Sequence, residues 1–66
     1  MAAEAIGEMA GRVWQYLNEQ GPVAPGRMAR DLGIPRTTVD RAIGWLAREE
    51  KLKMETDGRE EKVALK

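Results

Sequence analysis

The 66-residue sequence contains no cysteine, no histidine and no serine. Without cysteine there is no disulfide bond and no thiolate chemistry. Without histidine the chain lacks a common zinc ligand and the commonest general base near neutral pH. No apolar run approaches the ~20 residues that a membrane-spanning helix needs. No basic segment followed by an apolar stretch opens the chain, so we expect no secretory signal and a cytoplasmic protein.

Clusters of catalytic groups are equally scarce. The only adjacent carboxylates are Glu49-Glu50 and Glu60-Glu61, and sequence neighbours do not face each other on a helix or a strand. No glycine-rich phosphate loop and no metal-ligand spacing is present. We therefore expect a protein that is not an enzyme, with no cofactor, no bound metal and no small-molecule substrate.

The charges balance overall but are unevenly distributed. Eleven basic residues stand against eleven acidic ones, which argues against a strongly basic nucleic-acid binder. Residues 1–26 carry one arginine against three glutamates, whereas residues 27–41 carry four arginines against two aspartates. With 42% apolar and 33% charged residues, the chain is typical of one small globular domain spanning residues 1–66, with a modestly basic middle.

Three segments show the periodicity of helices. The first, residues 2–20, ends at Gly21-Pro22, and the second, residues 25–32, ends at Gly33. The third, about residues 36–50, begins after Pro35, which a helix start tolerates. The apolar residues at three- and four-residue spacing are Ile6, Met9, Ala10, Val13 and Leu17, then Met28, Ala29 and Leu32, then Val39, Ala42, Ile43 and Leu46.

Gly7 and Gly11 lie inside the first predicted helix, where each costs about 1 kcal/mol relative to alanine. On a helical wheel both fall beside Trp14. Two interpretations stay open: close contact with another element of the same chain, or a ridge that contacts a partner.

The remaining residues predict a β-hairpin. Leu52 and Met54 alternate with charged residues, as do Val63 and Leu65 in the last segment. A two-residue turn at Asp57-Gly58 would oppose like charges, which is unfavourable. We therefore predict a four-residue loop, Asp57 to Glu60, that opposes Leu52 to Leu65, Met54 to Val63 and Glu55 to Lys62. The apolar face of such a hairpin must lie on the helices.

The order of these elements predicts an α+β, mainly α, winged helix-turn-helix: three helices followed by a β-hairpin wing. Ala29 is the small residue expected where the two helices approach, Gly33 suits the turn between them, and Ile34 is the apolar residue expected next. The third helix would enter the major groove of double-stranded DNA by its N-terminal end.

Short polar and basic residues occupy that end of the third helix. The candidate DNA-contacting residues are Arg36, Thr37, Thr38 and Arg41, with Arg27 on backbone phosphate and Arg59 or Lys62 from the wing. Arginine pairs bidentately with guanine, threonine reaches bases or phosphate, and a helix N-terminus favours phosphate oxygens. The alternative is an ordinary solvated face at each of these positions.

Two longer stretches, residues 6–14 (IGEMAGRVW) and 42–51 (AIGWLAREEK), carry a family resemblance. The chain resembles, over about residues 6–65, a short bacterial and archaeal winged-helix family of uncharacterised function. The Gly-Trp-Leu-Ala-Arg-Glu run is the specific part of that signature. The resemblance implies the winged-helix fold and DNA binding by analogy of fold, with no catalytic residue or cofactor. Glu50 stands where the family pattern has glycine.

Trp45 shares its side of the third helix with Thr38, Arg41 and Arg48. Either it packs under the hairpin in a small separate core, or it forms with Trp14 a hydrophobic surface for a partner such as a second copy. We thus carry two functional hypotheses. The first is a DNA-binding protein, and candidate transcriptional regulator, whose affinity falls with salt. The second is a protein-interaction or dimerisation module on the same scaffold without DNA binding.

Overall fold

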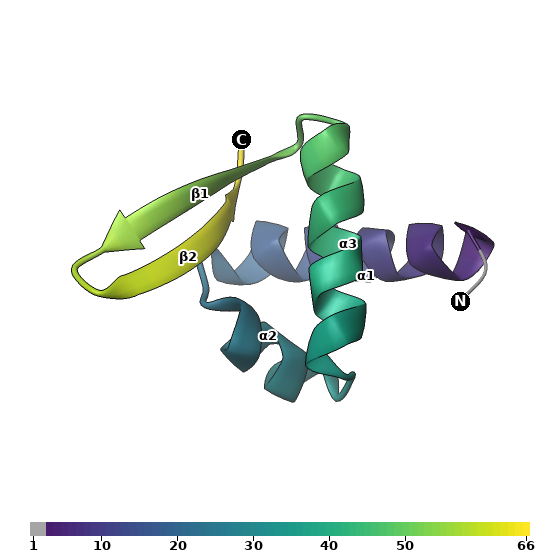
Figure 1. The fold of residues 1–66 in the computed structure, drawn as a ribbon, viewed down its shortest axis with the longest axis horizontal. Helices are drawn as coiled ribbons and strands as arrows, with labels where there is room; N and C mark the ends of the chain where they lie inside the picture. Colours follow the sequence, from purple (N-terminus) through teal and green to yellow (C-terminus); the bar gives the residue numbers. More distant parts are fainter. Residues whose placement is uncertain (1–2) are drawn as a thin grey trace.

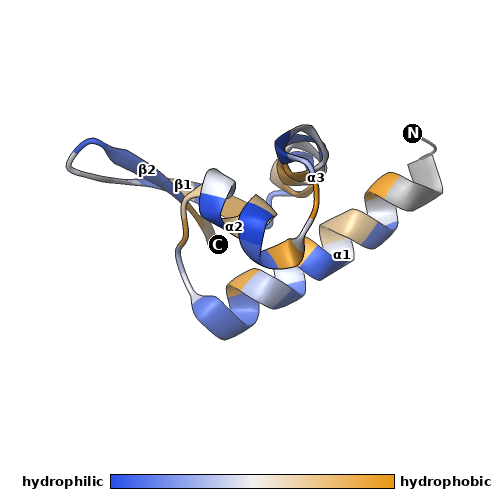
Figure 2. Cartoon of the chain, turned by 90° about the horizontal axis from the view of Figure 1, so that it is seen from below, coloured by the Kyte–Doolittle hydropathy of each residue, from blue (hydrophilic) through white to orange (hydrophobic). Residues whose placement is uncertain are grey.

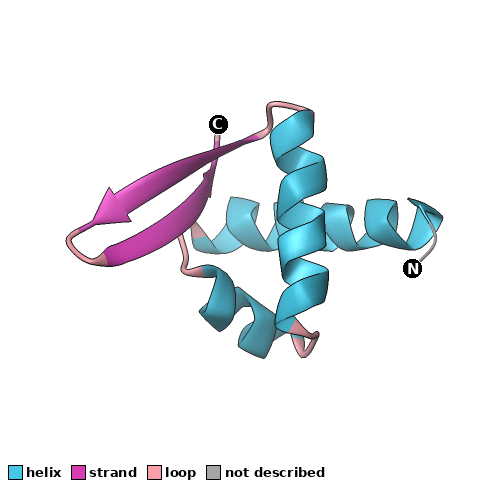
Figure 3. Ribbon diagram, viewed as in Figure 1, coloured by secondary structure: helices cyan, strands magenta, loops and turns pink. Residues whose placement is uncertain are grey.

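The computed structural model describes residues 3–66, with the side chains of residues 6–56 and 58–66. Three helices precede a two-stranded antiparallel hairpin (Figures 1 and 3). The elements are α1 (Ala3–Gln20), α2 (Pro25–Leu32), α3 (Arg36–Arg48), β1 (Leu52–Asp57) and β2 (Glu60–Leu65). In Figure 1, α3 crosses in front of α1, α2 lies beside them, and the hairpin extends to one side. The predicted element order and fold class are confirmed.

The helix boundaries agree with the sequence except at two ends. The predicted start of the first helix, residue 2, lies outside the described residues. The predicted end of the third helix at residue 50 is wrong, because α3 ends at Arg48. Glu50 has a left-handed φ of 58°, its N–H donates to the Ala47 carbonyl at 3.0 Å, and the Lys51 N–H donates to the Leu46 carbonyl at 3.0 Å. This pair of bonds is a Schellman motif, which ends the helix and turns the chain into β1.

The core forms where the three helices meet the base of the hairpin. Four fully buried side chains come from different segments: Val13 of α1, Met28 of α2, Val39 of α3 and Val63 of β2. Figure 2 shows the apolar residues of the helices gathered on the sides that face one another. Burying one such side chain contributes about 1.5–3 kcal/mol, so these contacts carry much of the stability of a chain this short.

The hairpin has the predicted register but a tighter turn. Leu52 pairs with Leu65, Met54 with Val63 and Glu55 with Lys62, as predicted. Pairing continues outward to Asp57 and Glu60, so the predicted four-residue loop is wrong and the turn is Gly58-Arg59. Gly58 has a φ of 66°, which a glycine at the first position of a type II′ turn adopts freely. Backbone pairing thus extends to the tip of the hairpin.

A short bridge that the sequence did not predict fixes the hairpin to the helices. Val23, between α1 and α2, exchanges two backbone hydrogen bonds with Val63, at 2.8 and 3.1 Å. β2 therefore lies between β1 and the Val23 segment. Ala64, which the alternation assigns to the outer face, is also buried.

Candidate nucleic-acid interface

The N-terminal turn of α3 is an open helix end. Pro35 precedes the helix in an extended conformation, and no side chain caps the first N–H groups. Arg36, Thr37 and Arg41 are exposed, and Thr38 is half-buried. Unpaired N–H groups and the aligned peptide dipoles give such an end a positive potential. Three of the four residues predicted for α3 are thus accessible to a partner.

Arg36 forms an ion pair with a carboxylate of its own helix, that of Asp40. Its Nε lies 3.0 Å from Oδ1 of Asp40, four residues later, and both side chains are more than half exposed. Exposed pairs of this spacing contribute only about 0.3–0.5 kcal/mol, so a phosphate can displace the carboxylate. Arg36 also reaches towards the first turn of α2, where its Nη1 would lie 3.5 Å from a Cβ on Gly26. The i, i+4 spacing of Arg36 and Asp40 was visible in the sequence, but its effect on the basic surface was not considered there.

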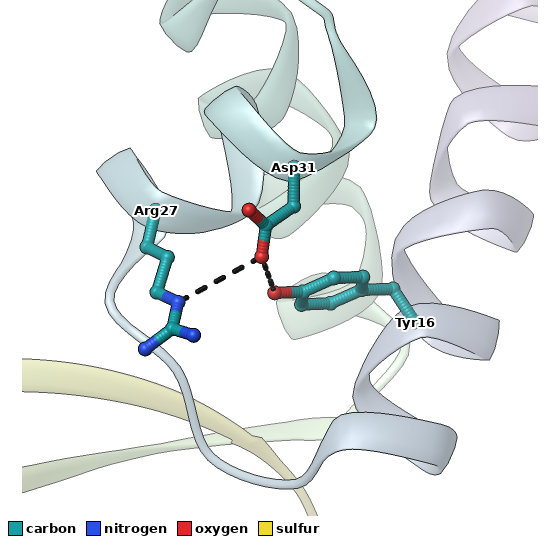
Figure 4. A network of polar contacts seen from close by, with 3 residues as sticks. All are labelled: Tyr16, Arg27 and Asp31. Carbon is teal, nitrogen blue, oxygen red and sulfur yellow. Dashed lines mark hydrogen bonds and ion pairs between the residues drawn. The ribbon is translucent and has the colours of Figure 1, made fainter.

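The same arrangement recurs at Arg27 in α2. Its Nε lies 3.7 Å from Oδ2 of Asp31, and the same oxygen accepts a 2.6 Å hydrogen bond from the Tyr16 hydroxyl (Figure 4). Tyr16 belongs to α1, so this cluster joins α1 to α2. Burial raises the pKa of Tyr16 above 10.0, and the hydrogen bond to Asp31 and its negative charge raise it further, while Arg27 acts in the opposite direction.

Both arginines are placed against the local electrostatics of their helices. Arg27 lies in the first turn of α2 and Arg36 in the first turn of α3, and neither first turn contains an acidic residue. A helix N-terminus stabilises negative charge and disfavours positive charge. The helix dipole therefore opposes both arginines, and their exposed pairs with Asp31 and Asp40 offset this by only about 0.3–0.5 kcal/mol each. Positions of this kind are where a functional requirement is expected.

The two wing residues lie apart from this surface. Arg59 is in the turn at the tip of the hairpin, which extends away from the helices (Figure 1). Lys62 is half-buried on β2 opposite Glu55. The structure therefore does not bring Arg59 and Lys62 together with the α3 residues.

Trp45 lines a surface groove and is too exposed for a small separate core under the hairpin, which was one of the two interpretations left open for it. Its side chain is 38% exposed and faces a groove of about 290 Å³ shared with Trp14, which is 41% exposed. Gly7 and Gly11 line the same groove, and a Cβ added to either would meet no atom within 4 Å. Of the two interpretations left open for these glycines, close contact with another element of the same chain is therefore excluded. Sequence periodicity predicted the side of the third helix on which Trp45 lies, but not which part of the chain faces that side.

The described residues offer little for other kinds of site. No cluster of three acidic, histidine or cysteine side chains that could hold a metal ion occurs among them. None of the described helices combines the length and hydropathy needed to cross a membrane. The exposed end of α3 and the Trp14–Trp45 groove hold most of the residues for which the sequence predicts a function.

A helix-turn-helix formed by α2 and α3, followed by a hairpin that packs on the core, defines a winged helix-turn-helix protein. Over residues 1–65 the chain matches the family described as "Winged helix-turn-helix domain (DUF2582)", and it belongs to that family. The expected fold and the resemblance to a short winged-helix family are both confirmed. No protein of curated function matches the chain.

Two solved structures are similar to this one. The solution NMR structure of protein BT2368 from Bacteroides thetaiotaomicron is 31% identical, with a TM-score of 0.88 over 98% of this chain and 79% of that one. A structure of HOP2 is 27% identical, with a TM-score of 0.68 over 88% of this chain and 98% of that one. The HOP2 structure is described as giving insight into DNA recognition and protein interaction domains and into homologous DNA pairing.

Proposed function

We propose that the chain binds double-stranded DNA by placing the N-terminal turns of α3 in the major groove, as a transcriptional regulator would. The observation that carries the proposal is the exposed, uncapped start of α3, whose first two turns carry the exposed residues Arg36, Thr37 and Arg41. Arg41 can pair with a guanine edge, and Thr37 and the helix N–H groups suit phosphate oxygens. This geometry is the one by which recognition helices enter DNA.

Contacts to the DNA backbone come from Arg27 of the neighbouring helix α2 and from Arg36 of α3 in this proposal. Arg27 and Arg36 are both held by carboxylates in exposed pairs, which phosphates can replace at small energetic cost. Arg59, at the wing tip, is the candidate for a more distant contact, as is Lys62 along the wing. The similarity to HOP2, whose structure is described in terms of DNA recognition, supports the proposal.

The direct test is binding of a mixed-sequence fluorescent duplex by the wild type and by Arg41→Glu. We expect Arg41→Glu to weaken binding at least tenfold, because a bidentate base contact and a charge attraction are both lost. Lys66→Glu is the matched control, since it makes the same charge change near the C-terminal end of α3, away from its N-terminal turn (Figure 1). Equal losses in the two variants would mean that only net charge matters, and the proposed position of α3 would be wrong.

The second candidate is a protein-interaction module that does not bind DNA. The zero net charge and the groove between the exposed Trp14 and Trp45 favour it. Because the groove and the N-terminal turn of α3 are formed by different residues, a measurement on one surface does not decide the other, and each needs its own test. Absence of salt-sensitive DNA binding, together with self-association, would leave the second candidate alone.

A further inference from the structure

The groove between α1 and α3 combines two exposed indoles with the bare backbone of two glycines. Its lining residues are Gly7, Ala10, Gly11 and Trp14 of α1, Trp45 and Leu46 of α3, and Lys51. Two of the three aromatic side chains of the chain stand here, each about two-fifths exposed. Exposed aromatic groups grouped on one surface are typical of contacts with a partner.

The glycines in the groove have no explanation within the chain. Gly7 and Gly11 are one helical turn apart on the same side of α1, and glycine is among the least favourable residues inside a helix. Space is open above both positions, and neither has a left-handed φ. What their missing side chains provide is room for another group to approach the backbone of α1.

The groove therefore carries both a part-exposed indole, that of Trp14, and open space above Gly7 and Gly11. A two-fold interface uses the same surface of both copies, so a suitably placed axis brings the indole of each copy to the open space of the other. In an antiparallel pair of α1 helices with the axis passing between Ala10 and Gly11, Trp14 of each copy faces Gly7 of the other. We propose that this groove is the interface of a symmetric homodimer in which α1 packs against α1 and Trp14 enters the partner copy's groove.

Two further observations favour a second copy over a different partner. The N-terminal turns of α1 project past α3 (Figures 1 and 2), so that another helix can lie along them. The chain has zero net charge, so two copies do not repel each other at long range. A partner selected by charge would instead need an excess of one sign around the groove, and Lys51 is the one charged residue among those that line it.

The size of the surface limits the strength of association. A standard stable interface covers about 800 Å² per partner, which is roughly a sixth of the 4485 Å² surface of this chain. The 18 residues of α1 form a helix about 27 Å long, so the contact falls short of that size. We therefore expect a reversible dimer with a dissociation constant in the micromolar range.

Sedimentation equilibrium of the whole chain without DNA, from about 5 µM to about 1 mM, tests the proposal. We expect the wild type to pass from monomer to dimer across this range. Gly7→Gln should raise the dissociation constant of the dimer at least tenfold, because the new side chain fills the open space above residue 7. Glutamine is a better helix former than glycine, so the monomer should stay folded. Trp14→Ala should have a similar effect by removing the projecting indole. Circular dichroism would verify the fold of each variant.

Gly44→Gln is the matched control, because Gly44 is an exposed helical glycine with open space above it and does not line the groove. It should dimerise like the wild type. A wild type that stays monomeric at the highest concentration would overturn the proposal, as would a folded Gly7→Gln that dimerises normally. A loss of dimer in Gly44→Gln as large as in Gly7→Gln would also contradict the assigned interface. Since DNA is absent, these outcomes are independent of the proposed DNA binding.

Discussion

Glu50 ends α3 with the backbone geometry that Gly33 uses to end α2. Their φ angles are 58° and 67°. In each case the N–H of this residue donates to the carbonyl three residues earlier, at 3.0 Å for Glu50 and 3.2 Å for Gly33. The N–H of the next residue donates to the carbonyl five residues before it, at 3.0 Å after Glu50 and 3.1 Å after Gly33. A glutamate therefore occupies a left-handed position that a side chain disfavours by roughly 1–2 kcal/mol.

Glu50→Gly should stabilise the domain. Relief of the left-handed strain exceeds the extra freedom that glycine gives the unfolded chain, so we expect the free energy of unfolding to rise by about 0.5–1 kcal/mol. For a domain of this size that gain raises the melting temperature by roughly 2–8 °C. Glu49→Gly is the control, because Glu49 has an ordinary φ of −83° and glycine there should lower stability. If both substitutions destabilise the domain, the interpretation of the α3 end is incorrect.

Thr37→Glu should separate stability from DNA binding. A glutamate in the first turn of α3 interacts favourably with the helix dipole and, four residues before Arg41, with its positive charge. The free energy of unfolding should therefore rise by about 0.5–1 kcal/mol. The same carboxylate would face DNA phosphates and engage Arg41, and the affinity for duplex DNA should fall at least tenfold.

The control for Thr37→Glu is Gln20→Glu, which adds the same charge at the end of α1. A negative charge at a helix C-terminus is unfavourable, so this variant should lose a few tenths of a kcal/mol while retaining most of its DNA binding. Urea unfolding and fluorescence anisotropy measure the two properties. Retained DNA affinity in Thr37→Glu would argue against a role for the start of α3.

The Tyr16–Asp31 hydrogen bond should make stability fall in alkaline solution. The folded protein has a raised pKa for Tyr16, so it binds this proton more tightly than the unfolded chain does. The associated stability is fully present below pH 10.0 and is lost as the pH rises through the folded pKa. Tyr16→Phe should cost about 0.5–1.5 kcal/mol at neutral pH, and this difference from the wild type should shrink at high pH.

The pKa itself can be followed by absorbance, because Tyr16 is the single tyrosine. Asp31→Asn should lower the pKa of Tyr16 but not return it fully to 10.0, since burial is the largest cause of the shift. An unchanged titration curve in Asp31→Asn would show that the carboxylate does not contribute.

Met28→Ala should be severely destabilising. Met28 is fully buried in α2, and truncating such a side chain costs about 2–5 kcal/mol, a large part of the roughly 3–10 kcal/mol expected for a domain of this length. Met54→Ala is the control, because Met54 is 51% exposed on β1 and its truncation should cost less than about 0.5 kcal/mol. Thermal unfolding followed by circular dichroism compares them. Similar losses in the two variants would contradict the assigned core.

Local patterns were sufficient to predict most of the fold. Turn residues such as Gly33 and the apolar spacing of the helices predicted every element, and charge pairing across the hairpin predicted its register. The Val23–Val63 bridge was missed because a single bridged residue has no alternation to detect. The end of α3 was misplaced because Glu50 is a helix-favouring residue in a position that tertiary structure makes left-handed.

The candidate site was harder to predict than the fold. Residue type identified Arg36 and Arg41, but only coordinates show that Asp40 holds the first of them and that Thr38 is half-buried. The environment of Trp45 depends on where α1 crosses α3, which is a long-range property. A helical wheel assigns each side chain a direction without showing which element lies there.

The central claim is that exposed basic groups around the start of α3 bind DNA, and its most direct test is a duplex titration at two salt concentrations. If three to five phosphates are neutralised by the candidate arginines and lysine, affinity should fall roughly 40- to 500-fold between about 50 and 200 mM salt. Arg41→Glu should make the logarithmic slope shallower by about one unit or more. Weak binding that does not change with salt, or a slope that Arg41→Glu leaves unaltered, would contradict the claim.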